Sequence, residues 1–144
     1  MFNPSRDQVR QFFFDVWAKY RAGEPLTGAE QPALEAVLSH PEYHTTLEHP
    51  ERYLERDYLP ESGDTNPFLH LSMHLAITEQ ISVDQPPGIR DRYERLLKQQ
   101  DEAMAAQHAV MDCLAEMIWQ AQRHNTPFDA KAYLSCLDRA LGQT

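Results

Sequence analysis

His70 and His74 are the two residues whose type and spacing point most directly to chemistry. In a helix, a spacing of four places both imidazoles on one stripe, one turn apart, where they can bind one metal ion. The alternative is that each ring is a core histidine, hydrogen-bonded to a carboxylate or a carbonyl. Spacing alone does not separate the two interpretations, so both stay open here.

His108 favours the metal interpretation because it lies on a separate predicted helix, among methionines that indicate packing rather than exposure. Two imidazoles from one helix and a third from another would form a site for zinc, iron or copper in a helical bundle. Asp112 and Glu116 follow His108 by one and two turns and are candidates for additional oxygen ligands.

The other histidines of this half of the chain lie close to prolines. His40, His44 and His49 are interpreted as exposed loop residues outside the site. The chain has no phosphate-binding glycine loop, no nucleophile elbow and no metalloprotease motif. No general acid–base pair stands out, so the sequence assigns no catalytic residue and leaves open whether the protein is an enzyme.

The helix that carries His70 and His74 is the clearest one in the sequence. A turn-forming run over 61–66 precedes Pro67, which is a typical helix start. From there to about Ser82, apolar residues cover nearly every direction of the helix, as expected of a helix that is central and buried. This helix must position the histidine pair.

Apolar residues recur at helical spacing in most of the remaining chain, and no alternating strand pattern interrupts them. Prolines divide the stretch from 42 to 64, which we expect to be a linking region with one helical turn near 50–56. The fold prediction is a single all-α domain over 1–144, a helical bundle of about five or six helices. The further helices are predicted from a start at 3–5 to near Gly23, and over 31–39, 89–124 and 129–141. The 89–124 stretch is predicted as one long helix or as two joined near Gln100.

Charge and hydropathy exclude several classes of partner. The formal charge of −9 repels nucleic-acid phosphates and anionic lipids, so we expect no nucleic acid and no membrane as partner. No stretch reaches the roughly 18 apolar residues of a membrane span, and the amino terminus does not resemble a secretion signal. A cytoplasmic location is therefore expected. Cys113 and Cys136 lie in apolar helical stretches and are predicted to be buried free thiols.

A non-catalytic function is also consistent with the sequence. Met104, Met111, Met117 and Trp119 could form a surface for a protein partner or a second copy, although core packing explains methionines on a helix equally well. Two hypotheses follow. The first is a non-enzymatic interaction or regulatory protein, and the second is a metal-binding bundle that uses His70, His74 and His108.

Two motifs resemble a bacterial family known only as a domain of unknown function, the family numbered 1841. The motifs are NPFLHLSMHLAI over 66–77 and MDCLAEMIWQAQR over 111–123. The resemblance covers most of the chain and implies a small helical protein, without an activity to carry over. It further implies that relatives often have a second histidine one turn before His108, where this chain has Met104, which argues against a two-metal site here.

Overall fold

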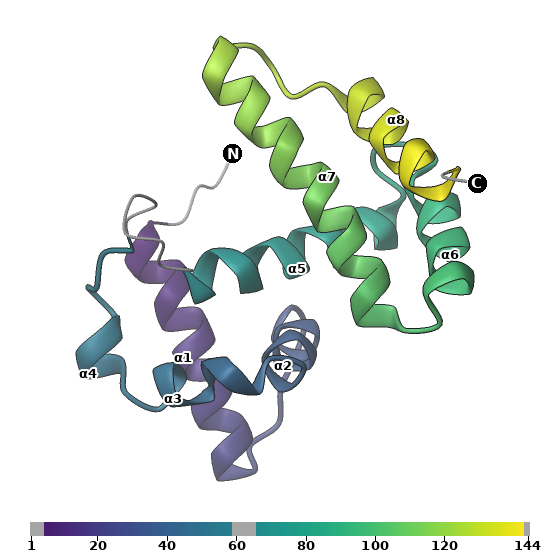
Figure 1. The fold of residues 1–144 in the computed structure, drawn as a ribbon. Helices are drawn as coiled ribbons and strands as arrows, with labels where there is room; N and C mark the ends of the chain where they lie inside the picture. Colours follow the sequence, from purple (N-terminus) through teal and green to yellow (C-terminus); the bar gives the residue numbers. More distant parts are fainter. Residues whose placement is uncertain (1–4, 59–65, 143–144) are drawn as a thin grey trace. The chain divides into compact units, whose positions relative to one another are not determined.

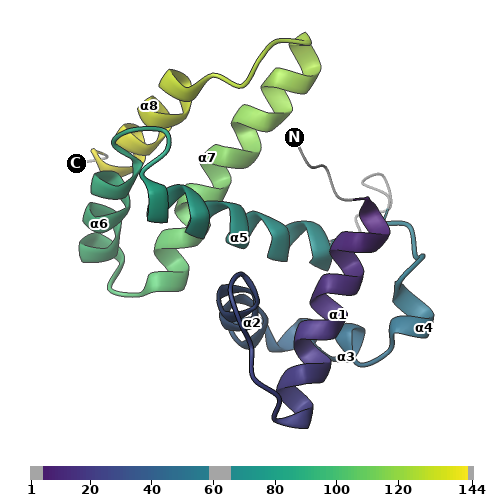
Figure 2. The ribbon, with the colours of Figure 1, turned by 180° about the vertical axis from the view of Figure 1, so that it is seen from behind.

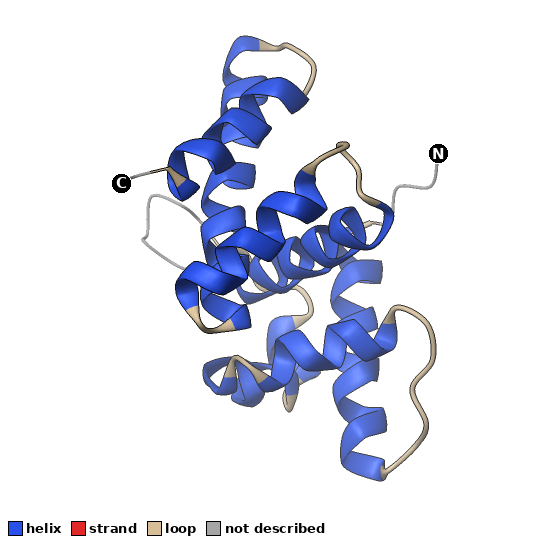
Figure 3. Cartoon of the chain, turned by 90° about the vertical axis from the view of Figure 1, so that its right-hand side faces the viewer, coloured by secondary structure: helices blue, strands red, loops and turns tan. Residues whose placement is uncertain are grey.

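The computed structural model describes residues 5–58 and 66–142, and within these ranges the elements are helices, with no strand (Figure 3). The all-α class is therefore confirmed. The predicted number of five or six helices is wrong, because eight α-helices and one short 3₁₀ helix lie in the described ranges. The additional ones are single turns at and after the end of the second predicted helix, where Pro41 begins the 3₁₀ helix and Pro50 begins another turn. The predicted turn over 61–65 lies outside the described residues.

The chain divides into two compact units, Met1–Leu75 and Ala76–Thr144, and the division falls inside one helix, α5. The part of α5 up to Leu75 belongs to the first unit. The helices of the first unit are α1 (Arg6–Ala22), α2 (Glu30–Leu38), the 3₁₀ helix η1 (Pro41–Tyr43), α3 (His44–Leu47), α4 (Pro50–Tyr53) and the beginning of α5 (Pro67–Val83).

Local signals fix both ends of α1. The Ser5 hydroxyl accepts a hydrogen bond from the backbone N–H of Gln8, and the Gln8 side chain accepts one from the backbone N–H of Ser5. This reciprocal arrangement satisfies amides that the first turn leaves without helical partners. Gly23 ends the helix in the left-handed region, with φ 73°, a conformation that glycine adopts without strain.

Aromatic and aliphatic side chains from α1, α2, α3 and α5 form the core of the first unit. Phe14 on α1 packs edge-to-face against Phe68 in the first turn of α5, with ring centroids 5.4 Å apart. This contact places the beginning of α5 on the core. The buried members of the core are Phe13, Phe14, Val16, Trp17, Ala33, Ala36, Val37, Leu47, Phe68 and Leu71.

Arg10 on α1 is a buried cation, with 2% of its surface exposed. Its Nη1 donates hydrogen bonds to the carbonyls of Tyr53, Leu54 and Arg56, at 3.0, 3.0 and 2.7 Å. The guanidinium also lies 4.9 Å from the ring centroid of Phe68. Burial lowers the pKa of Arg10, and the nearby Arg6 charge adds to this, yet a guanidinium remains protonated. Arg10 therefore fastens the end of α4 and the residues after it to α1.

The second unit contains the end of α5 and the helices α6 (Ile89–Gln100), α7 (Ala103–His124) and α8 (Ala130–Leu141). These last three helices contact one another pairwise, and both views show α8 beside α6 and α7 (Figures 1 and 2). Asp101 adopts the left-handed conformation, with φ 59°, and separates α6 from α7. Of the two predicted forms of the 89–124 stretch, two helices rather than one long helix are correct.

A disulfide between Cys113 of α7 and Cys136 of α8 crosslinks the second unit, with the two Cα atoms 5.8 Å apart. The prediction of two free thiols is therefore wrong. The two cysteines were correctly placed on apolar helical stretches, but their pairing depends on how α7 packs against α8. That packing is a non-local property, which the spacing of 23 residues does not reveal.

Candidate metal centre

The first turns of α5 position His70 and His74. The Asn66 side chain accepts hydrogen bonds from two backbone amides of the first turn, those of Phe68 and Leu69, at 3.0 and 3.2 Å. One turn further on, the two imidazoles lie next to each other as their spacing predicts. Their Nε2 atoms are 3.2 Å apart and their ring centroids 4.9 Å apart. His74 is 1% exposed, while His70 is half-buried.

His40 is the third histidine of this cluster, although the sequence analysis placed it outside the site as an exposed loop residue. That prediction is wrong, because His40 is only 4% exposed and its Nε2 lies 3.0 Å from Nε2 of His70. A signal for burial was present in the sequence. Ala33, Ala36 and His40 follow one another at spacings of three and four, so His40 continues the buried stripe of α2 past the end of the helix.

A backbone carbonyl selects the tautomer of the neutral His40 ring. Nδ1 of His40 lies 2.7 Å from the carbonyl oxygen of Ala36. Because a carbonyl oxygen can only accept, Nδ1 carries the proton and donates it, so Nε2 of the neutral ring carries a lone pair. Metal-binding histidines are typically oriented in this way, with the second ring nitrogen bonded to a carbonyl or a carboxylate.

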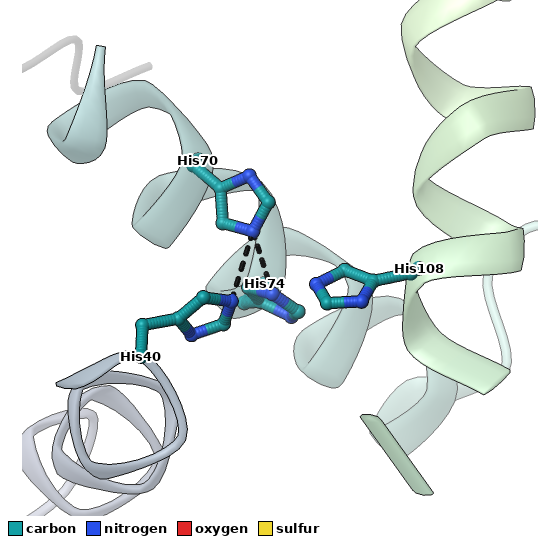
Figure 4. A group of neighbouring side chains, drawn as sticks. All are labelled: His40, His70, His74 and His108. Carbon is teal, nitrogen blue, oxygen red and sulfur yellow. Dashed lines mark hydrogen bonds between the residues drawn. The ribbon is translucent and has the colours of Figure 1, made fainter. Parts of the chain in front are cut away.

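The two separations that centre on His70 Nε2 match the spacing of neighbouring ligands around one metal ion. Two nitrogens bound at about 2.0–2.1 Å to a tetrahedral ion lie about 3.3 Å apart. The observed separations from His70 Nε2 are 3.0 Å to His40 and 3.2 Å to His74 (Figure 4). The His70 nitrogen carries at most one proton for these two nitrogen neighbours, whereas a metal ion would satisfy all three lone pairs at once. We refer to His40, His70 and His74 as the histidine trio.

The donors available at the trio are nitrogen atoms. No carboxylate or thiolate among the described residues joins this cluster of metal-binding side chains. Imidazole nitrogen suits zinc, copper, iron and nickel, whereas magnesium and calcium prefer oxygen ligands. The cluster could therefore hold a transition-metal ion.

Tyr43 lies beside two members of the trio. Its ring is nearly parallel to that of His40, with an interplanar angle of 6° and centroids 5.4 Å apart, and it meets the His70 ring edge-on at 5.9 Å. Burial raises the pKa of the Tyr43 phenol, and the Glu42 carboxylate adds to this increase. Tyr43 thus places a neutral aromatic ring next to the imidazoles of His40 and His70.

The remaining two histidines of the linking region lie outside the trio. His44 Nε2 lies 2.8 Å from the carbonyl oxygen of Val37, and its ring packs against Trp17 with centroids 4.3 Å apart. His44 is therefore half-buried, and so is His49, whereas both were predicted to be exposed loop residues. His49 lies 3.2 Å from a carboxylate oxygen of Glu51. Both rings have structural contacts of their own.

A family model described as "Domain of unknown function (DUF1841)" matches residues 5–139, which is most of the chain. The chain belongs to this family. No curated protein and no solved structure matches the chain. The DUF1841 match confirms the family resemblance drawn from the sequence, and it includes the positions of all three trio histidines and of His108.

The remaining ligands predicted from the sequence are His108, Asp112 and Glu116, and all three lie on α7, in the second unit. His108, which Figure 4 also draws, is half-buried, whereas Asp112 and Glu116 are exposed. Met111 and Met117 are buried in the core of the second unit, so core packing accounts for them, while Trp119 is 53% exposed.

The described part of the chain contains no helix long and apolar enough to span a bilayer.

Proposed function

We propose that this protein binds one transition-metal ion, with Nε2 of His40, His70 and His74 as ligands. The observation that carries the proposal is the pair of short nitrogen–nitrogen separations, 3.0 and 3.2 Å, that centre on His70. These separations are of hydrogen-bond length, but the single Nε2 proton of His70 can serve only one of its two neighbours, whereas an ion could bind all three nitrogens. The hydrogen bond from His40 to the Ala36 carbonyl supports the proposal because it places the lone pair of the neutral ring on Nε2, the atom that would bind the metal.

Zinc is the first choice of metal, and copper and iron are the alternatives. All three accept imidazole nitrogen, and zinc needs no thiolate or carboxylate for tetrahedral coordination. The formal charge of −9 supports cation binding in general, because an acidic protein raises the local concentration of cations. Neutral imidazoles leave the double charge of the ion intact, so the overall acidity of the chain helps to compensate it.

His108, which the sequence predicts as the third ligand beside His70 and His74, is proposed as the fourth ligand. The support is its half-buried side chain on α7 and its position within the matched family region. Asp112 and Glu116 receive less support, since exposed carboxylates are common without a metal.

A function through protein contacts alone has weaker support than metal binding. That hypothesis requires methionine and tryptophan side chains on the surface of the protein. Met111 and Met117 are buried, and Trp119 is exposed. Metal binding and a regulatory role are compatible with each other, and the proposal assigns no reaction to the site.

Metal analysis of the protein purified without a histidine tag tests the proposal. We expect about one equivalent of a transition metal per chain, and a rise in melting temperature when zinc is added back after chelation. A ligand present at 100 times its Kd stabilises the folded state by about 2.7 kcal/mol. Less than about a tenth of an equivalent, together with no thermal shift by zinc, iron or copper, would contradict the proposal.

A further inference from the structure

The three trio histidines are not held equally firmly by the backbone. His70 and His74 belong to α5, a continuous helix of 17 residues, so backbone hydrogen bonds fix their relative positions. His40 lies outside regular structure, between the end of α2 and η1, with φ −127° and ψ 71°. Its ring therefore needs side-chain contacts to keep Nε2 directed toward the other two nitrogens.

Contacts at its edge do not fix the plane of an imidazole. Nδ1 of His40 donates to the Ala36 carbonyl at 2.7 Å and Nε2 lies 3.0 Å from Nε2 of His70, so both contacts act at the edge of the ring. A contact on the face of the ring opposes tilting about the line between them. The near-parallel Tyr43 ring provides such a contact, at a centroid separation of 5.4 Å that corresponds to offset stacking.

Tyr43 is also well placed to hold its position. It ends η1, three residues after His40, so the same short turn carries both rings. The backbone N–H of Tyr43 donates to the carbonyl of His40 at 2.9 Å, which closes this turn. The edge-on contact with His70 then links the turn to α5.

We infer that Tyr43 is a positioning residue of the metal site, whose aromatic ring orients His40 as a ligand. This inference rests on the proposed metal-binding function and adds to it a residue that does not bind the ion. Partners that orient metal-bound histidines typically change metal affinity roughly 10- to 100-fold when they are replaced. The ring, rather than the hydroxyl, is the group that performs this role.

The test compares Tyr43→Leu with Tyr43→Phe and with the control Tyr53→Leu. Tyr53 lies in the same linking region, packs against the same core, and its ring pairs with Arg56 rather than with the trio. Zinc affinity is measured by competition with a chelating dye, and the geometry of the site by the visible absorption of bound Co²⁺. We expect Tyr43→Leu to weaken zinc binding roughly 10- to 100-fold and to alter the Co²⁺ spectrum. Tyr43→Phe and Tyr53→Leu should retain the wild-type affinity and spectrum.

The outcomes separate this inference from the function on which it rests. Wild-type affinity and an unchanged Co²⁺ spectrum in Tyr43→Leu would overturn the role of Tyr43 and leave the metal site intact. An equal loss in Tyr43→Phe would assign the effect to the hydroxyl and would also overturn the role of the ring. A wild-type protein that binds neither zinc nor Co²⁺ would reject the proposed function and this inference together.

Discussion

His70→Ala is expected to reduce the metal content of the protein from about one equivalent to less than a tenth, and to abolish the thermal shift caused by zinc. The reason is that His70 is the central member of the trio, since its Nε2 lies next to both His40 and His74. Its removal leaves two imidazoles without the nitrogen between them. His70 is also the trio member that tolerates replacement best, because it is half-buried while the other two are almost fully enclosed.

His49→Ala and His124→Ala are the matched controls for this experiment. Both remove an imidazole, but His49 lies beside Glu51 in the linking region and His124 is exposed at the end of α7. Metal content should be unchanged in both. Equal metal content in His70→Ala and in the two controls would place the site elsewhere. Circular dichroism of each variant establishes that the fold is retained.

Arg10→Ala is expected to lower the free energy of unfolding by about 3 kcal/mol, because buried carbonyls that lose a charged donor cost about 1–3 kcal/mol each. Arg10 donates to three carbonyls after α4, those of Tyr53, Leu54 and Arg56, and water can replace some of these bonds once the side chain is gone. The truncation also removes packing against Phe68. Urea unfolding followed by circular dichroism measures the change.

Arg6→Ala is the control for Arg10→Ala. Arg6 lies one turn earlier on α1 and pairs with Asp57 at 2.7 Å, but both side chains are well exposed. Exposed ion pairs contribute little, so this variant should unfold at nearly the wild-type urea concentration. If Arg10→Ala and Arg6→Ala unfold at the same concentration, Arg10 does not fasten the linking region to α1.

Local signals explain which helices the sequence predicts well. Ser5 and Gln8 cap the beginning of α1, Asp129 caps α8 by accepting from the Ala132 amide, and Gly23 ends α1. Each signal acts over three or four residues, so it can be recognised without knowledge of the tertiary fold. The pair His70 and His74 was found for the same reason.

The features that the sequence analysis missed depend on contacts between distant residues. His40 precedes a proline and resembles a loop histidine, yet it lies next to His70, which is 30 residues further along the chain. The pairing of Cys113 with Cys136 likewise requires α7 to pack against α8. Single-turn helices such as α3 and α4 are stabilised by tertiary contacts, including Leu47 in the core and the Arg10 hydrogen bonds, rather than by their own helical propensity.

X-ray absorption spectroscopy of the zinc-loaded protein is the most direct measurement of the proposed centre. It reports the type, number and distance of the atoms bound to the ion. We expect at least three imidazole nitrogens at about 2.0–2.1 Å from the zinc ion, and a loss of imidazole scattering in His40→Ala. A coordination sphere of oxygen atoms only, or a spectrum that His40→Ala leaves unchanged, would contradict the assignment of the ion to His40, His70 and His74.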